Sequence, residues 1–527
     1  MTTPGRLRAW VLGTVLLTAG CAARTPAAAP LATPDGAAAN GSGRTIPPAT
    51  PPISDPDPAR ALDRTATLAG RVDGVLASAT FDRATVGFVV RSLDTGDTLY
   101  ARNGRTWLVP ASTMKVLTAV AAAKRLGWNF RFETRLVAMG PIVNGVVDGD
   151  LLVVGSGDPT INRRHPDRLH ALDDWARALR AQGIRRIAGH VVGDDSAVQH
   201  PGWGIGWAWD DLLEDYGAAN SALQFNENVV TVTVGPGHTP GAPAVVYLSP
   251  SNHGLLVDST DAVTTDAAAE LSLSLARAPG TRLLDVQARM PWNGAPVSYP
   301  IAVANPTLYF TGELRQALLR QGIVVDGVAV DIDDESTRPV AGHGTTLLVD
   351  RSAPLTDIAR EMLAWSINLY AEALVTALDA TPPVSTADGL TVFRDTLEGL
   401  GVLPGGYSTR DGSGLSRNDY LSADALVTTL TGAWHAPELR DTLLTVLPTT
   451  GVPGTLERRL AGTPAAGRVR AKTGSMSNVR SLAGFVETTA GEPLAFAFVS
   501  NGFDVRGAEI DQRVDELLLA LVDLPRQ

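Results

Sequence analysis

The chain changes texture twice along its length, and these two changes constrain its fold more than any other feature of the sequence. Residues 61–132 and 343–527 contain helical stretches together with β-branched or apolar strands. Residues 133–342 consist instead of short strands, Gly/Pro turns and one or two helices. Because the two flanking regions share one texture, we expect them to form a single discontinuous α/β (α+β) domain that is interrupted by a large β-rich insertion at 133–342.

The expected elements of this domain follow from hydrophobic periodicity and turn residues. These patterns predict the following elements: a helix at 61–77, a hairpin that begins with VGFVVRSL at 86–93, a helix at 112–126 stopped by Gly127, helical stretches at 354–378 and 422–434, a strand containing KTG, a hairpin at 481–501, and a final amphipathic helix with Ile510, Val514, Leu517 and Leu521 at helical spacing.

The N-terminus has the pattern of an export signal. Arg6 and Arg8 precede an apolar run at 9–19, which is too short to span a bilayer. The sequence LTAGC, ending at Cys21, resembles the bacterial lipobox, with Thr18 where leucine is usual. We therefore expect a signal peptide at 1–20, a lipid on Cys21, and a disordered Ala/Pro-rich tether at 21–60. The alternative is a cleaved signal whose cysteine is incidental.

The composition excludes several classes of function. Cys21 is the only cysteine, so the chain downstream of it has no intramolecular disulfide, no thiolate metal site and no cysteine nucleophile. The eight histidines are scattered, and we expect no metal site. The net charge of −11, without a basic run carrying interleaved aromatics, argues against nucleic acid as a partner.

Lysine is almost absent from this chain, which has 44 basic residues but only Lys115, Lys124 and Lys472 as lysines. Lys115 follows Ser112 by three residues, so the amine and the hydroxyl share one helical face. A serine nucleophile needs a base, and a buried amine can lose its proton whereas a guanidinium cannot. Taken alone, the tetrapeptide is also compatible with a helix cap beside a solvated lysine.

Two further elements follow in order. Ser366 and Asn368 stand two residues apart, and they can face one site only at a helix end or a turn. Lys472-Thr473-Gly474 directly precedes the apolar hairpin, where glycine permits the close approach of a ligand or another backbone. Each element alone is compatible with an ordinary helix surface or a strand-entry turn. Their joint order, with two of the three lysines in the two lysine-requiring elements, outweighs those separate interpretations.

The set S-x-x-K, S-x-N and K-T-G resembles the signature of penicillin-binding proteins and serine β-lactamases. The chain resembles one group in particular, the class C low-molecular-mass penicillin-binding proteins, which are D-alanyl-D-alanine carboxypeptidase/endopeptidases. The resemblance runs from about residue 61 to the C-terminus, and the separation of 254 positions between Ser112 and Ser366 fits the large insertion of that group. It implies a transpeptidase-like domain with helices on an antiparallel sheet. The stretches that carry it are VPASTMKVLTAVAAAKRLG, GSGDPT (155–160), YGAANSALQFNEN (216–228), DGSGLSR (411–417) and KTGSMSNVRSLAGFV.

The resemblance implies an acyl-enzyme mechanism on peptidoglycan stem peptides, with β-lactam antibiotics as covalent inhibitors and no cofactor. Ser112 would attack the carbonyl of the penultimate D-Ala, with Lys115 as the base for acylation. Ser366 would relay the proton to the leaving group, and Asn368 would hold the substrate amide and Lys115. Lys472 would keep Lys115 neutral by charge repulsion and attract the substrate carboxylate.

The same resemblance implies contacts around these groups. Thr473 would bond the substrate carboxylate beside Gly474, and the backbone N–H groups of Ser112 and Ser475 would form the oxyanion hole. Ser475 stands where many relatives have threonine, which keeps this backbone donor. Three further residues would line the pocket for the diamino-acid side chain of the stem peptide: Arg417, Asp211 and Met476.

Two rival functions remain open on the sequence. A serine β-lactamase would need a dedicated deacylation base, and no glutamate motif is placed for that role. A non-catalytic, cell-wall-binding lipoprotein would not need three complete motifs. The expected location is the cell envelope, with the protein lipid-anchored at the outer face of the cytoplasmic membrane or in the periplasm. The sequence does not decide between trimming of terminal D-Ala and cleavage of cross-bridges.

Overall fold

The computed structural model describes residues 58–199, 202–379 and 383–526. The predicted signal peptide, Cys21 and all but the last three residues of the predicted tether lie outside this part of the chain. Those last three residues form the start of helix α1 (Pro58–Leu76), in which proline occupies the first helical position. No helix in the described ranges is long and apolar enough to cross a membrane.

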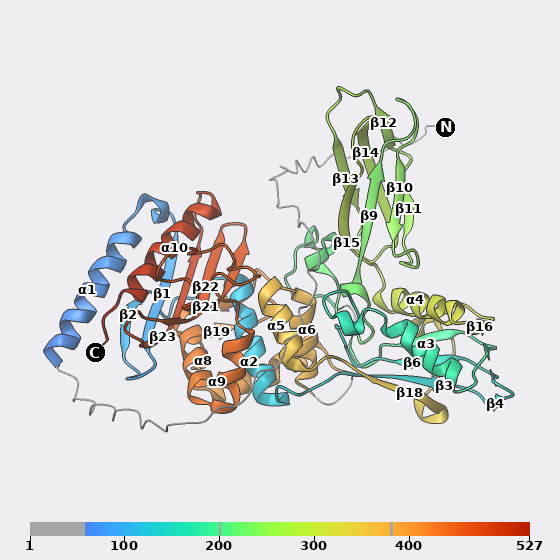
Figure 1. The fold of residues 1–527 in the computed structure, drawn as a ribbon, viewed down its shortest axis with the longest axis horizontal. Coiled ribbons are helices and arrows are strands. Elements are labelled where there is room, and N and C mark those ends of the chain that lie inside the picture. The colour runs from blue at the N-terminus through green and yellow to red at the C-terminus, as the bar shows by residue number, and fades with distance from the viewer. Residues whose placement is uncertain (1–57, 200–201, 380–382, 527) are drawn as a thin grey trace, which may run out of the picture. The chain divides into compact units, whose positions relative to one another are not determined.

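A five-stranded sheet built from both ends of the described chain organises the domain that carries the three motifs (Figure 1). All its pairings are antiparallel, and β1 pairs with β23, so a strand near the N-terminus lies directly beside one near the C-terminus. In order across the sheet, the strands are β2 (Thr98–Arg102), β1 (Thr85–Ser92), β23 (Pro493–Asn501), β22 (Val479–Glu487) and β21 (Val469–Met476).

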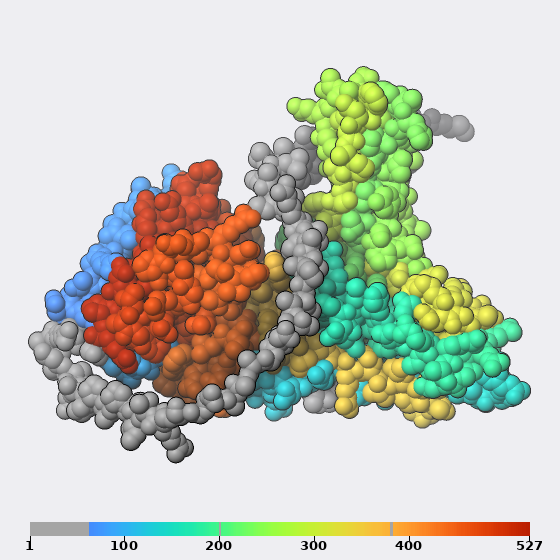
Figure 2. All heavy atoms as spheres, in the orientation of Figure 1, coloured from blue at the N-terminus to red at the C-terminus, as the bar shows by residue number. Residues whose placement is uncertain are grey.

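The two faces of this sheet carry side chains of different size. Leu494, Phe496 and Phe498 of β23 point to the face covered by α1 and α10 (Gly507–Val522). The alternate residues of the strand, Ala495, Ala497 and Val499, belong to the hydrophobic core on the opposite face. Successive side chains of this strand point to opposite faces of the sheet, and both faces are buried. Helices therefore pack closely against small residues on one face and against bulky rings on the other. In the space-filling view, the blue N-terminal and red C-terminal segments form one body (Figure 2).

The helices on the second face bury a common apolar core that reaches from α2 to α9. They surround the short strands β19 (Tyr407–Ser408) and β20 (Tyr420–Leu421), which pair with each other. These helices are α2 (Met114–Leu126), α5 (Leu355–Trp365), α6 (Asn368–Ala377), α7 (Thr386–Gly399), α8 (Ala423–His435) and α9 (Pro437–Val446). The predicted combination of helices and an antiparallel sheet is confirmed.

One part of the insertion, built from both of its ends in the sequence, is a small α/β layer. Helices α3 (Ala171–Ala181) and α4 (Pro306–Arg320) share its core with two sheets. One sheet has the order β17 (Ala329–Asp331), β8 (Val191–Asp194), β6 (Leu151–Val154), β3 (Glu133–Ala138) and β18 (Thr345–Arg351). The other has the order β16 (Val324–Val325), β7 (Arg186–Ile187), β5 (Val146–Val147) and β4 (Ile142–Val143). Because β18 pairs with β3, we propose that the insertion extends past residue 342 to Arg351.

The middle of the insertion, at residues 229–302, consists of two sheets that share one apolar core (Figure 1). One sheet has the order β10 (Val245–Ser249), β9 (Val229–Gly235) and β15 (Val297–Ala302). In the other, β14 (Leu283–Pro291) pairs with β11 (Leu256–Asp258), β12 (Ala262–Thr265) and β13 (Ser272–Ala276). The β-rich texture of the middle of the sequence thus arises largely from this pair of sheets.

The helical stretch expected at 354–378 is divided in two. Helix α5 ends at Trp365, Ser366 adopts a left-handed conformation with φ 65° and ψ 35°, and α6 begins at Asn368. A positive φ is uncommon for a residue other than glycine and breaks the helical hydrogen-bond pattern. The break gives Ser366 and Asn368 the helix-end positions that the sequence required for both to face one site.

Candidate active site

Ser112 lies in a strained turn at the start of α2. A short 3₁₀ turn, Ala111–Thr113, leads into the helix, and Ala111 has a φ of 48°. Gly414 packs directly against this turn, because a Cβ built on Gly414 would lie 1.9 Å from the Ala111 carbonyl oxygen. Strained backbone persists where the surrounding structure enforces it and is concentrated at functional sites. The half-buried Ser112 side chain is therefore presented by a turn that both α2 and the 411–417 loop hold in place.

Lys115 is fully buried and donates to three neutral acceptors. Its Nζ lies 2.9 Å from Ser112 Oγ, 2.6 Å from Asn368 Oδ1 and 2.7 Å from the carbonyl oxygen of Ser413. No carboxylate oxygen of the described residues forms an ion pair with it. The i, i+3 spacing within one helical turn brings amine and hydroxyl together, as the sequence predicts.

Burial lowers the pKa of Lys115 to about 7, because a charged ammonium loses its hydration in the interior. The nearby carboxyls of Asp411, Glu372 and Asp419 act in the opposite direction, since negative charge favours the protonated amine. Desolvation outweighs them. The amine therefore exchanges its proton close to neutral pH, in hydrogen-bond contact with a serine hydroxyl, which is the arrangement that general-base activation needs.

Asn368, at the first position of α6, connects Lys115 to the insertion. Its Oδ1 accepts from Lys115, and its Nδ2 donates to the Tyr216 carbonyl at 2.9 Å. Ser366, half-buried, stands at the helix break two residues earlier. The structure therefore joins Ser112, Lys115 and Asn368 by direct hydrogen bonds, with Ser366 linked to them through the chain.

The K-T-G segment lies on β21, the edge strand beside Ser112. A Cβ built on Gly474 would lie 3.0 Å from the Ser112 backbone nitrogen and 2.8 Å from the Pro110 carbonyl oxygen. Any side chain here would thus push the strand away from Ser112. Ser481 on β22 ties the same turn to the sheet, because its Oγ donates to Pro110 at 2.5 Å. The motif and the serine, 362 positions apart in sequence, are neighbours in space.

Lys472 is fully buried, and its Nζ donates to the Thr473 carbonyl at 2.8 Å. Burial lowers the pKa of Lys472 well below its usual value, and the charge of Lys115 adds to the effect. The sequence suggested that repulsion from Lys472 keeps Lys115 neutral. Burial, rather than that repulsion, is the main cause of the lowered pKa of Lys115.

The residues predicted at the periphery lie around this centre at different depths. Ser475 is exposed and Met476 half-buried at the end of β21. The exposed Arg417 approaches the turn after this strand, with its Nη1 3.5 Å from the Ser477 carbonyl oxygen. Asp211 accepts from the Tyr216 hydroxyl at 3.0 Å, and the carbonyl of the same tyrosine holds Asn368. The segment carrying Asp211 is therefore tied to the centre through Tyr216.

Sequence reasoning missed a group of buried acids behind Lys115. Glu372, Asp411 and Asp419 are each at most 1% exposed. Burial raises the pKa of Glu372 and of Asp419, with the charge of Asp411 adding to both shifts. One signal was available: Glu372 stands in NLYAEALVTAL, a helix apolar on all sides, and a charge in such a helix has to be buried.

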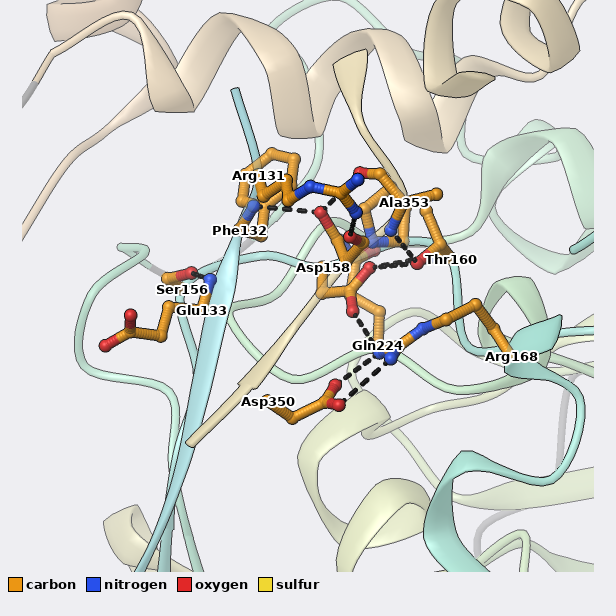
Figure 3. A network of polar contacts seen from close by, with 12 residues as sticks. Arg131, Phe132, Glu133, Ser156, Asp158, Thr160, Arg168, Gln224, Asp350 and Ala353 are labelled. Atoms are coloured by element: carbon orange, nitrogen blue, oxygen red, sulfur yellow. Dashed lines mark hydrogen bonds and ion pairs between the residues drawn. The ribbon is translucent and has the colours of Figure 1, made fainter. Parts of the chain in front are cut away.

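A second polar network, around the GSGDPT segment, joins the insertion to the domain that carries the three motifs (Figure 3). Arg168 forms ion pairs with Asp158 and Asp350, and Asp158 also accepts from the backbone nitrogen and the hydroxyl of Thr160. The Thr160 hydroxyl in turn accepts from the backbone nitrogen of Ala353, just before α5. This segment therefore fixes the start of α5, the helix that ends directly before Ser366.

The segment that follows reaches α6 itself. Asn162 donates to the Tyr370 hydroxyl at 2.9 Å, and His165 stacks on the Tyr370 ring with centroids 5.9 Å apart. Tyr370 stands two residues after Asn368 and is fully buried. The insertion thus supports both helices at whose junction the S-x-N element lies.

The family can be decided once this geometry is compared with known proteins. The profile of the D-Ala-D-Ala carboxypeptidase 3 (S13) family matches residues 68–520. The chain belongs to this family. Among its relatives, a D-alanyl-D-alanine carboxypeptidase of Actinomadura sp. (strain R39) is 34% identical over 472 residues, which is 86% of this chain and 84% of the relative. The carboxypeptidase DacB of Haemophilus influenzae is 29% identical over 80% of this chain and 87% of its own length.

Solved structures agree with the family. The crystal structure of penicillin binding protein 4 (dacB) from Haemophilus influenzae superposes with a TM-score of 0.72 at 26% identity, covering 87% of this chain and 98% of that one. A second structure of that protein, in complex with a novel β-lactam, superposes with a TM-score of 0.70 at 25% identity. The predicted penicillin-binding-protein fold is confirmed. The chain thus belongs to a family of peptidases, which are hydrolases.

Proposed function

We propose that the protein is a serine-type D-Ala-D-Ala carboxypeptidase that cleaves peptidoglycan stem peptides through an acyl-enzyme on Ser112. The observation that carries this proposal is the contact between the buried, neutral-pH-titrating amine of Lys115 and the Ser112 hydroxyl at 2.9 Å. Family membership supplies the substrate class, because the relatives are D-alanyl-D-alanine carboxypeptidases.

In the first step, neutral Lys115 takes the proton of the Ser112 hydroxyl while Oγ attacks the carbonyl carbon of the penultimate D-Ala. Backbone N–H groups of Ser112 and Ser475 receive the developing oxyanion, each worth about 3 kcal/mol in comparable sites. The close packing of Gly474 on Ser112 supports this assignment, since it brings β21 alongside the serine.

The C–N bond then breaks, and the leaving D-Ala nitrogen receives a proton through Ser366 from the Lys115 ammonium. Asn368 keeps the amine oriented throughout, because its Oδ1 accepts from Lys115 in the resting site. Water attacks the ester and restores the Ser112 hydroxyl, releasing the shortened stem peptide. All atoms and protons are accounted for by substrate, water and these side chains.

Lys472 and Thr473 would hold the substrate carboxylate. A carboxylate placed beside Lys472 offsets the desolvation that lowers the pKa of this lysine, so substrate binding and protonation of Lys472 favour each other. Arg417, Asp211 and Met476 would contact the diamino-acid side chain. Cleavage of cross-bridges would use the same site. In that reaction the leaving nitrogen belongs to a second stem peptide rather than to a free D-Ala.

We further propose that the protein is exported and held in the cell envelope by a lipid on Cys21. The apolar run at 9–19 and the sequence LTAGC support this part of the proposal. Mass spectrometry of the N-terminal peptide from the native host would detect a diacylglyceryl cysteine, and a signal peptide cleaved elsewhere would contradict it.

The test of the nucleophile is intact mass spectrometry after incubation with benzylpenicillin. We expect one penicilloyl adduct on the wild type and none on Ser112→Ala, with release of free D-Ala from a stem-peptide substrate lost in the same variant. An adduct that survives the substitution would refute the assignment. Turnover of nitrocefin without a stable adduct would favour a β-lactamase instead.

A further inference from the structure

We propose that Glu372 is a positioning residue for acylation, which holds the backbone at Gly412 and Ser413 so that the Ser413 carbonyl orients the Lys115 amine toward Ser112. This inference rests on the proposed function, because it concerns the base of the same reaction. Glu372 touches neither the nucleophile nor the substrate site, and it acts through the main chain of a loop.

The carboxylate of Glu372 is placed for this task by α6. Its oxygens accept from the Ser413 nitrogen at 2.9 Å and from the Gly412 nitrogen at 3.2 and 3.3 Å. The Ser413 carbonyl, on the next peptide unit, then accepts from Lys115 Nζ at 2.7 Å. Glu372 therefore fixes the backbone nitrogen of the residue whose carbonyl oxygen holds the lysine.

One helix thus controls two of the three acceptors around the amine. Asn368 and Glu372 are four residues apart on α6 and share a face. Asn368 offers its amide oxygen to Lys115 directly, whereas Glu372 offers the Ser413 oxygen through the loop. A shift of α6 would move both acceptors together, which keeps the geometry around Nζ consistent.

The same loop is fixed from its other side by Asp411. Its carboxylate accepts from the backbone nitrogens of Gly414 and Ser416 at 2.6 and 2.7 Å, and from Trp207 Nε1 at 2.8 Å. Two buried carboxylates thus share the backbone donors of one loop. Asp411 bonds the Gly414 nitrogen of the peptide unit that carries the Ser413 carbonyl, and Glu372 bonds the nitrogen of Ser413 itself, so the two acids hold this residue from both sides.

The pH at which the lysine titrates should not depend on Glu372. The titratable groups that face Lys115 are Glu372 on α6, Asp411 and Asp419 on the loop, and Lys472 on β21. Burial raises the pKa of Glu372 to about 8, above the value of about 7 for Lys115, so Glu372 carries its proton where the amine titrates. The uncharged Glu372→Gln should therefore leave the pKa of Lys115 close to that of the wild type.

The experiment measures the rate constant of acylation by benzylpenicillin between pH 5 and 9 for three full-length variants. For Glu372→Ala, which removes both acceptor oxygens, we expect the plateau rate to fall at least about tenfold, the effect of losing the hydrogen bonds that hold the loop backbone. For Glu372→Gln, which keeps an oxygen able to accept from both backbone nitrogens, we expect a plateau and an acidic limb close to those of the wild type.

The control is Glu313→Gln on α4, which changes a buried glutamate that bonds to Asn252 in the insertion. We expect its plateau rate and its acidic limb to match the wild type. A purely structural role of Glu372 would lower the thermal stability of Glu372→Ala and leave the plateau rate of the folded protein unchanged. If Glu372→Ala does not fold, Glu372→Asp, which withdraws the carboxyl group from the loop by one methylene, replaces it, and we expect its plateau rate to fall while that of Glu372→Gln is retained.

Two outcomes would overturn the inference: a plateau of folded Glu372→Ala or Glu372→Asp that equals the wild type, or a plateau of Glu372→Gln that falls as far as that of Glu372→Ala. Failure of the proposed function is seen separately, because the wild type itself would then form no adduct on Ser112.

Discussion

Two polar networks in this protein surround a basic side chain with different kinds of partner. At the junction around GSGDPT, Arg168 makes direct ion pairs with Asp158 and Asp350. At the nucleophile, Lys115 is surrounded by a hydroxyl, an amide oxygen and a peptide carbonyl, and the acids Glu372 and Asp411 stand behind the loop rather than against the amine.

The difference decides which group can release a proton. Burial acts to lower the pKa of Arg168, but the hydrogen bonds and charges of Asp350 and Asp158 outweigh it, and the pKa is raised. For Lys115 burial prevails and the pKa falls to about 7. A permanently charged guanidinium in direct pairs serves cohesion, and a desolvated amine with neutral acceptors serves chemistry.

The largest effect on acylation should follow from replacing Lys115 by arginine, the cationic residue found at the GSGDPT junction. In Lys115→Arg the guanidinium stays protonated and cannot accept the Ser112 proton. We expect the rate constant of acylation by benzylpenicillin to fall by about 10³-fold, the usual worth of a general base. Stopped-flow or quenched mass spectrometry measures it. A loss below tenfold would show that Lys115 is not the base.

The next effect should come from removing the cation of the junction. Arg168→Leu leaves the carboxylates of Asp158 and Asp350 without their partner in a site where Asp158 is 2% exposed. We expect the free energy of unfolding to fall by about 3 kcal/mol, measured by urea denaturation, with a smaller effect on acylation than Lys115→Arg.

Arg360→Leu is the matched control. Arg360 pairs with Asp357 on α5, the helix that follows the junction, but both side chains are more than 40% exposed. We expect its free energy of unfolding to change by less than about 1 kcal/mol. Equal effects of the two substitutions would show that the buried pairing at the junction has no special role.

The smallest effect should come from the third lysine. Lys124 pairs with Glu438 at 2.9 Å on the surface, with side chains 44% and 59% exposed. For Lys124→Ala we expect a loss of at most about 1 kcal/mol in the free energy of unfolding and the wild-type rate of acylation. A strong loss of acylation would contradict the distinction between buried and surface lysines.

Local sequence rules were sufficient for those parts of the site that one helical turn or one helix end determines. Ser112 and Lys115 share a turn, so their contact follows from spacing alone. The break at Ser366 was required once Ser366 and Asn368 had to face the same site, and the left-handed residue provides it.

The rest depends on packing between distant segments. Ser413 lies 298 residues from Lys115, and no local rule indicates that its carbonyl, rather than its hydroxyl, contacts the amine. The strained turn at Ala111 likewise packs against Gly414, which is far away in the sequence and which no local rule places there. The division of the insertion into an α/β layer and a pair of sheets depends on pairings such as β3 with β18, some 210 residues apart.

The scarcity of lysine allows the central claim to be tested directly. A protein labelled with ¹³C at the lysine ε-carbon has only three such signals, and Lys115→Arg identifies the one that belongs to Lys115. The account predicts that this signal titrates with a midpoint near pH 7, as the buried amine loses its proton. A Lys115 signal that remains that of a charged ammonium up to pH 9 would contradict it.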